Sequence, residues 1–331
     1  MNKLILPAFA IFITSCSSDF EAKVDDIVNI APVITTKKLQ TKEHTTSGTS
    51  IGTIVFSDKN KNDKLTISTN SDAFIVNEKT GEVTVGPNTI LDYEDTSTLT
   101  FTVSVSDGLA TTEQEILLTL EDINEFDTLD VNQKELTSYF SHLALNGRSN
   151  NLTSIQKWDA PMKIFLDGNI TTEYKATVQN ILDEFNALFD LGDFSISLVD
   201  TLAEANTHLY LSNASEIEEL WADIFAVVGN GSYNGYQIST ENNSILSNSR
   251  IWVADDIAST FKHQLGHALG LGHSNNCNTE ISFMCSNFLP GVVLSDEEKE
   301  IIRLLYHNDI IPGTTDEELN DVVSNLILLG Q

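Results

Sequence analysis

Three histidines at fixed spacing constrain this chain more than any other feature. His263 and His267 are four residues apart, so on a helix their side chains lie on one face. Gly270 allows the helix to end and the chain to turn back, which brings His273 round as a third nitrogen ligand. Three imidazoles leave the fourth tetrahedral position of a zinc ion open to water, as catalytic zinc sites do. The spacing therefore predicts one metal centre at these side chains.

The residues before the motif predict the elements that carry it. Ile251–Val253 is an apolar, β-rich run and predicts a strand. Asp255 and Asp256 belong to the residue types that cap the first turn of a helix. Apolar residues follow at helical spacing: Ile257, Phe261, Leu265, Ala268 and Leu269. We therefore expect a strand that leads into the helix with the first two histidines.

Gln264 stands where a catalytic zinc site normally has a glutamate as its general base. A neutral amide has no usable basicity, and losing a positioned base costs about 10²–10⁴ in rate. Zinc alone still lowers the pKa of its water to about 7, so slow hydrolysis stays physically possible. Three hypotheses remain open: an inactive zinc-binding protein, a slow peptidase with a substitute carboxylate nearby, or an altered codon in an ordinary enzyme.

The motif resembles the metzincin signature HExxHxxGxxH, which a methionine turn (Met-turn) follows. The three histidines match the family ligands, Gly270 matches the family glycine, and Met284 matches the Met-turn. The resemblance covers roughly residues 155–307, where Trp158–Leu166 and Ser295–Tyr306 are similar to the first strand region and last helix of a matrixin-like domain. It implies an α+β zinc metalloendopeptidase domain that acts on peptides or proteins, with Gln264 in place of the general base.

Residues 1–15 predict a signal peptide. Leu4–Ile13 is an apolar run that is too short to span a bilayer. Ile13–Cys16 resembles a bacterial lipobox, which implies cleavage before Cys16 and a lipid on its thiol; the alternative is a simple secretory signal with a free cysteine. Ser17 differs from the inner-membrane retention signal, so the resemblance implies an extracytoplasmic protein, lipid-anchored to the bacterial outer membrane or cell surface.

Two further cysteines, Cys277 and Cys285, remain once Cys16 carries lipid. Outside the cytoplasm an even remainder suggests a disulfide, which would clamp the loop between His273 and Met284. The alternatives are two free thiols or a thiolate on the metal. Because three histidines already complete a catalytic zinc site, the disulfide is favoured.

Strong acidity excludes one class of partner. The chain has 18 Lys and Arg against 48 Asp and Glu, a formal net charge of −30. Nucleic-acid binding needs a basic surface, so we expect none, and docking on anionic lipid is equally disfavoured. With 41% apolar residues the chain can build sizeable cores, and its length predicts two domains.

Residues 31–126 show the pattern of an all-β domain. Short alternating segments are separated by turn clusters such as Lys79–Gly81 and Ser106–Gly108. The expected strands lie within Ser50–Phe56, Lys64–Ser68, Ala73–Asn77, Glu82–Val85, Thr98–Val105 and Glu115–Leu120. Their number and spacing predict a β-sandwich.

This region also resembles a cadherin repeat. Leu91–Glu94 is similar to the family's Leu-Asp-Arg-Glu, with Tyr93 in place of Arg, and Asp122–Glu125 is similar to its closing motif. The resemblance implies calcium (Ca²⁺) ligands at Glu43, Asp92, Glu94, Asn124 and Glu125, and a partial second site at Asp58, Asn60 and Asp107. The alternative is that these residues serve in turns and helix caps, since only one repeat is present.

The remaining stretches complete a multidomain organisation, a cadherin-like β-sandwich followed by an α+β zincin-like domain. We expect a tether over residues 16–30, a linker over 127–154 and the metal domain over 155–331. The expected helices are Val131–Leu145, Thr171–Phe189, Asp296–Tyr306 and Glu317–Leu329, and the expected strands are Met162–Leu166, Phe194–Val199 and His208–Leu211. Gly229–Tyr236 is expected to form a loop near the rim of the cleft.

Two classes of function follow. One is a surface-anchored zinc (Zn²⁺) peptidase of impaired activity, in which the β-sandwich acts as a spacer. The other is an inactive lipoprotein that binds zinc and calcium and holds a peptide or protein ligand. Gln264 favours the second class, whereas the complete ligand set and Met284 favour the first.

Overall fold

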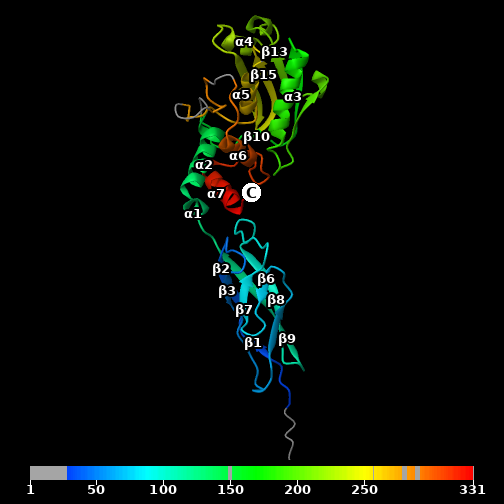
Figure 1. Ribbon diagram of the computed structural model, residues 1–331, viewed down its shortest axis with the longest axis vertical. Coiled ribbons are helices and arrows are strands. Elements are labelled where there is room, and N and C mark those ends of the chain that lie inside the picture. The colour runs from blue at the N-terminus through cyan, green and yellow to red at the C-terminus, as the bar shows by residue number, and fades with distance from the viewer. Residues whose placement is uncertain (1–27, 148–150, 256, 278–281, 288–290, 331) are drawn as a thin grey trace, which may run out of the picture. The chain divides into compact units, whose positions relative to one another are not determined.

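The computed structural model describes residues 28–147, 151–255, 257–277, 282–287 and 291–330. Expectations for the signal peptide, for Cys16 and for the tether as far as residue 27 lie outside this part of the chain. The chain divides into two compact units, with the division between Ile123 and Asn124 (Figure 1). Among the described residues, none of the helices has the length and apolar character needed to cross a bilayer.

The first unit is a β-sandwich, as the sequence predicts. One sheet has the strand order β2-β9-β8-β5, the other has the order β3-β7-β6, and β1 pairs with β4 (Figure 1). The strands are β1 (Val33–Ile34), β2 (Lys38–Lys42), β3 (Ser50–Thr53), β4 (Phe56–Ser57), β5 (Thr66–Thr69), β6 (Phe74–Val76), β7 (Glu82–Val85), β8 (Thr98–Ser106) and β9 (Thr111–Glu121). All pairs are antiparallel except β2 with β9, which are parallel.

Alternation along the two longest strands of this unit builds its core. Buried residues alternate with more exposed ones on both strands: Phe101, Val103 and Val105 on β8, and Ile116, Leu118 and Leu120 on β9. Fully burying a side chain of this kind contributes about 1.5–3 kcal/mol. The period of two seen in the sequence is therefore the direct cause of the sandwich.

The second unit is built on a mixed sheet in which most neighbouring strands are parallel. The order is β10-β15-β13-β11-β12, and β14 adds to β15 as an antiparallel strand. The strands are β10 (Lys157–Trp158), β11 (Met162–Gly168), β12 (Ile196–Val199), β13 (Thr207–Leu211), β14 (Gly235–Asn242) and β15 (Ile245–Val253). This α/β arrangement confirms the predicted fold class of the C-terminal half.

Helices cover both faces of this sheet. The helices are α1 (Glu125–Thr128), α2 (Val131–Ser141), α3 (Thr172–Asn186), α4 (Ala222–Val228), α5 (Ala258–Ala268), α6 (Asp296–Leu305) and α7 (Asp316–Leu329). Sheet residues such as Ile164 and Leu209 share one core with α3 and α5, whereas Trp252 packs with α4 in a smaller cluster. Phe185 of α3 and Phe261 of α5 are fully buried in the larger core. Helix α5 contacts β14 and β15, so packing against the sheet fixes its position.

The segment expected to link the two domains is packed within the second unit. Helix α2 begins with a capping box between Asp130 and Gln133, and both α1 and α2 contact α7. A π-helical turn, His142–Asn146, continues α2, and its Leu143 is fully buried in the same core as α5. Residues 124–147 therefore belong to the architecture that surrounds the histidines.

Candidate metal centre

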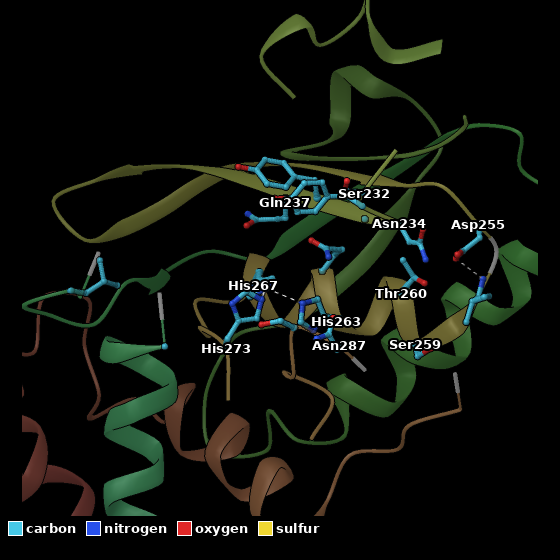
Figure 2. A pocket seen from close by; sticks show the side chains of 18 residues that line it. Ser232, Asn234, Gln237, Asp255, Ser259, Thr260, His263, His267, His273 and Asn287 are labelled. Atoms are coloured by element: carbon cyan, nitrogen blue, oxygen red, sulfur yellow. Dashed lines mark hydrogen bonds between the residues drawn. The ribbon is translucent and has the colours of Figure 1, made fainter. Parts of the chain in front are cut away.

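Helix α5 carries two of the three imidazoles. His263 and His267 lie one turn apart, and His263 is only 3% exposed. The chain turns back at Gly270, which takes a φ of +111°, a conformation that L side chains rarely adopt. A Cβ at this position would also meet the backbone oxygen of Gln156 at 2.2 Å. Only glycine therefore permits the turn that brings His273 to face the other two rings (Figure 2).

The three rings converge through their Nε2 atoms. The Nε2 of His267 lies 3.1 Å from that of His263 and 3.2 Å from that of His273. A tetrahedral zinc ion with bonds of about 2 Å to nitrogen would hold two such atoms about 3.3 Å apart. The spacing fits one ion of this size, so the triad could bind a metal ion.

Backbone carbonyls fix the proton on two of the three imidazoles. Nδ1 of His263 donates to the oxygen of Phe283 at 2.8 Å, and Nδ1 of His267 donates to the oxygen of Leu271 at 2.8 Å. Since a carbonyl oxygen only accepts, each Nδ1 carries the proton, and a neutral ring then has a bare Nε2. Burial, together with the nearby His273 ring, lowers the pKa of His263 to about 4, so this ring is neutral at neutral pH. Burial also lowers the pKa of His273.

The third ligand is held by the segment that precedes β10. The amide of His273 donates to the oxygen of Gly147 at 2.5 Å, and Nε2 of His142 donates to the oxygen of His273, 3.1 Å away. A Cβ at Gly272 would meet the backbone of Gly147 at 2.5 Å, so two glycines allow this close approach. Sequence spacing missed this contact, because it joins residues more than a hundred positions apart.

Met284 packs against α5 at Gly266, and the metzincin resemblance places a Met-turn at this residue. It is fully buried, and a Cβ at Gly266 would meet its sulfur at 2.4 Å. Glycine inside a helix costs roughly 0.5–1 kcal/mol relative to alanine. At Gly266 the missing side chain lets the helix backbone contact the sulfur of Met284 directly. A glycine inside a helix is unusual, so this residue could have indicated the close contact from the sequence.

A disulfide joins Cys277 to Cys285, with the two Cα atoms 5.6 Å apart. It connects the loop after His273 to the residue after Met284. The amide of Ser274 also donates to the oxygen of Met284 at 3.0 Å. The loop after His273 and the turn at Met284 are thus tied together by one covalent bond and one hydrogen bond.

A buried carboxylate anchors the Met-turn backbone from α6. Glu298 is 1% exposed and closes a capping box with Ser295. Its Oε1 also accepts from the amide of Phe283 at 3.1 Å and from the hydroxyl of Ser282. Because Phe283 supplies the carbonyl that orients His263, Glu298 acts on a ligand through one residue. The sequence predicts the helix that carries Glu298 but gives no sign of these contacts.

A cleft of about 780 Å³ opens in front of the triad. Strand β14 forms its opposite wall, with Gln237 facing the histidines across it (Figure 2). The loop predicted over residues 229–236 extends too far, because β14 already begins at Gly235. Within the described residues β14 pairs only with β15, so its outer edge is open.

Gln264 lines this cleft next to His263 and is 6% exposed. A Cβ at Gly235 would meet its Cγ at 2.9 Å and its Nε2 at 3.0 Å, so a glycine at the start of β14 leaves room for the amide. Asp255 is the one carboxylate among the described residues that line the cleft. The expectation that Asp255 caps α5 is wrong, because Ile257 occupies the cap position without a side-chain bond. Asp256 lies outside the described residues.

The residues expected to bind calcium are only partly brought together. Glu43, Glu94 and Asp122 each offer an oxygen within 4.8 Å of the others. Glu43 already accepts from the amides of Tyr93 and Ile123, at 2.8 Å each. Asp58, Asp63 and Asp107 form a second group of this kind, in which Asp63 stands where Asn60 was expected.

Two of the other expected calcium ligands, Asp92 and Asn124, serve local structure. Oδ1 of Asp92 accepts from the amides of Glu94 and Asp95 within its own turn. Asn124 caps α1 by accepting from the amide of Asp127, and Glu125 is the first residue of that helix. Asn124 and Glu125 belong to the second unit. The capping and turn roles are those that the alternative interpretation predicts.

Comparisons with known proteins match the two units separately. Residues 133–248 match the family described as protein of unknown function DUF2927, and this match ends before His263. Human protocadherin-24 EC1-2 is 34% identical over 29% of this chain and 45% of its own length, with a TM-score of 0.27. Mouse clustered PcdhgC3 EC1-3 is 20% identical over 28% of this chain and 33% of its own, with a TM-score of 0.25. The chain thus spans less than half of either, and no curated protein gives a significant match.

Proposed function

We propose that this chain is an extracytoplasmic, lipid-anchored protein of the zinc metalloendopeptidase type, with its hydrolytic activity impaired by Gln264. One observation carries the proposal: the Nε2 atoms of His263, His267 and His273 converge, with His267 Nε2 3.1 Å from His263 Nε2 and 3.2 Å from His273 Nε2. Backbone carbonyls accept from Nδ1 of His263 and of His267, which turns both Nε2 atoms toward one point where a cation would fit. Three nitrogen ligands with an open fourth position are typical of catalytic zinc.

The residues of the cleft can bind and align an extended peptide. The open edge of β14 offers backbone donors and acceptors, so a peptide can add to it as a further strand in front of the triad. Zinc, when held by the three histidines, supplies a Lewis acid and lowers the pKa of a water molecule. Gln264 can donate or accept a hydrogen bond but cannot take up a proton, which costs about 10²–10⁴ in rate.

A second function, binding without cleavage, is favoured by the charges in the cleft. Asp255, the one carboxylate among the described lining residues, already accepts from the amide of Ile257 at 3.2 Å. A chain that keeps three ligands and lacks a base beside them would hold a peptide intact. In this case the protein is a surface lipoprotein that binds zinc, and calcium in its first unit, and retains a protein ligand.

Elemental analysis of the purified protein tests the metal centre. We expect about one zinc per chain, as one tetrahedral site requires, and loss of that zinc in His263→Gln. Absence of stoichiometric zinc from the wild type would remove both functions. Release of the protein from the membrane fraction by Cys16→Ala tests the lipid anchor.

Restoring the carboxylate separates the two functions. In a peptide-library assay with zinc, Gln264→Glu should cleave about 10²–10⁴ times faster than the wild type. Gln237→Glu is the matched control, because it adds the same charge to the facing wall of the same cleft. A zinc-loaded Gln264→Glu protein that cleaves nothing would leave binding as the function.

A further inference from the structure

One end of the cleft differs in chemistry from the rest. Asp255, Asn234, Thr260 and Ser259 gather on the side of His263 that faces away from His273 (Figure 2). Among the described residues that line the cleft there is neither Lys nor Arg. The only formal charge of the described lining is therefore the carboxylate of Asp255, which makes the field at this end negative.

Ser259 supplies a second, independent observation. It lines the cleft and is 5% exposed, and its hydroxyl has no hydrogen-bond partner among the described residues. Buried hydroxyls without a partner are rare in native structures, because the lost hydrogen bond with water is not replaced. Asp255 uses Oδ1 for the amide of Ile257, whereas its Oδ2 has no hydrogen bond within the described part of the chain. At this end of the cleft, Oδ2 of Asp255 and the hydroxyl of Ser259 therefore have no hydrogen-bond partner within the described part of the chain.

We propose that this end of the cleft is a specificity pocket for a basic side chain, Lys or Arg, of the bound peptide. The inference rests on the proposed function, since the peptide is the one aligned along β14. Oδ2 of Asp255 accepts from the ammonium or guanidinium group, and the hydroxyls of Ser259 and Thr260 and the amide oxygen of Asn234 offer further acceptors. An acidic side chain is repelled there, and an aliphatic one leaves the carboxylate desolvated without a partner. Asp255 is thus a specificity-determining residue.

Binding of short peptides to the full-length, zinc-loaded wild type tests this pocket. The probes are fluorescein-labelled alanine hexapeptides in which Lys, Leu or Glu occupies each of the two central positions in turn, and the readout is fluorescence anisotropy. Gln264 is an advantage in this assay, because it slows hydrolysis of the probe. We expect the best Lys peptide to bind about tenfold more tightly than its Leu counterpart and the Glu peptide to bind most weakly.

Three variants locate the effect. Asp255→Asn should weaken binding of the Lys peptide about tenfold and leave the Leu peptide unchanged. Ser259→Ala, which removes one acceptor without changing charge, should have a smaller effect in the same direction. Asp159→Asn is the matched control, because Asp159 is an exposed carboxylate of the same unit that does not line the cleft.

Equal affinities for the Lys, Leu and Glu peptides overturn the inference, as does an Asp255→Asn protein that binds the Lys peptide as tightly as the wild type. Failure of every peptide to bind overturns it as well. The proposed function is tested by the zinc content of the wild type and by peptide cleavage in Gln264→Glu, and neither measurement depends on Asp255. Failure of the proposed function can therefore be told apart from failure of this inference.

Discussion

Glu298→Gln tests whether the backbone behind the ligands sets the metal affinity. Glu298 is 1% exposed and accepts from the amides of Ser295 and Phe283 and from the hydroxyl of Ser282. Glutamine keeps the shape but replaces one oxygen with a donor. Because each carboxylate oxygen accepts from a backbone N–H, the new amide group must face a donor whichever way it turns.

The expected loss follows from these contacts. A hydrogen bond to a charged acceptor contributes about 1.5–3 kcal/mol, and an unpaired buried donor costs about 1–3 kcal/mol. Removing a buried charge offsets part of that loss, because burial penalises the carboxylate. We expect the free energy of unfolding to fall by about 2–3 kcal/mol. Since the oxygen of Phe283 orients His263 and Glu298 holds the Phe283 backbone, zinc affinity should fall about tenfold, the lower end of the loss seen when an outer-shell partner itself is removed.

Two measurements follow the two effects. Competition with a chelator gives the dissociation constant for zinc, and urea unfolding gives the stability. The three tryptophans, Trp158, Trp221 and Trp252, all belong to the second unit, so their fluorescence reports on that unit alone.

Glu318→Gln is the matched control. Glu318 closes the same kind of capping box with Thr315 at the start of α7, but it is exposed and makes no contact with the Met-turn. It should leave zinc affinity unchanged. The reasoning is refuted if Glu298→Gln binds zinc within about twofold of the wild type, below the usual outer-shell effect, or if the control loses as much affinity.

Three further predictions follow from the same structure. Gly266→Ala should destabilise the second unit by about 1–3 kcal/mol in urea, because the new methyl group meets the sulfur of Met284; wild-type stability would contradict this contact. Without metal, stability should fall by about 2 kcal/mol between about pH 7 and pH 5, because the unfolded chain protonates His263 near pH 6.5 whereas the folded pKa is about 4. Urea titrations at both pH values check this, and an equally steep slope in His263→Gln would refute it. Calcium should raise the melting temperature of the first unit by calorimetry, less so in Glu94→Gln than in the exposed control Asp95→Asn; no shift at millimolar calcium removes that site.

Elements with a strong hydrophobic period were predictable from the sequence. Thr98–Val105 alternates, and the structure has β8 over nearly the same residues; Thr171–Phe189 has a helical period, and α3 lies within it. Strand β14 was missed because it is an edge strand without a fully buried residue, so it shows no apolar alternation. The start of α5 was misplaced because Asp255 is a good capping residue, whereas Ile257 occupies the cap position.

In the candidate site, too, some features were predictable from the sequence and others were not. Helix geometry places His263 and His267 on one face, and the glycine at position 270 signals the turn that brings His273 to them, so the sequence places these residues together. The support from Gly147 and Glu298 depends on contacts between distant segments, and local spacing carries no information about such contacts. Gly266 is the exception, because a glycine inside a helix is itself a sign of close packing.

The hydrogen bond between Gly147 and His273 limits how far this protein can be truncated from its N-terminal side. A fragment that starts at the expected edge of the metal domain, near residue 155, lacks the strap that holds the loop of the third histidine. We expect such a fragment to hold His273 less firmly, for a reason unrelated to the three histidines themselves. Recombinant versions meant to report on the histidines should therefore begin no later than Asn124.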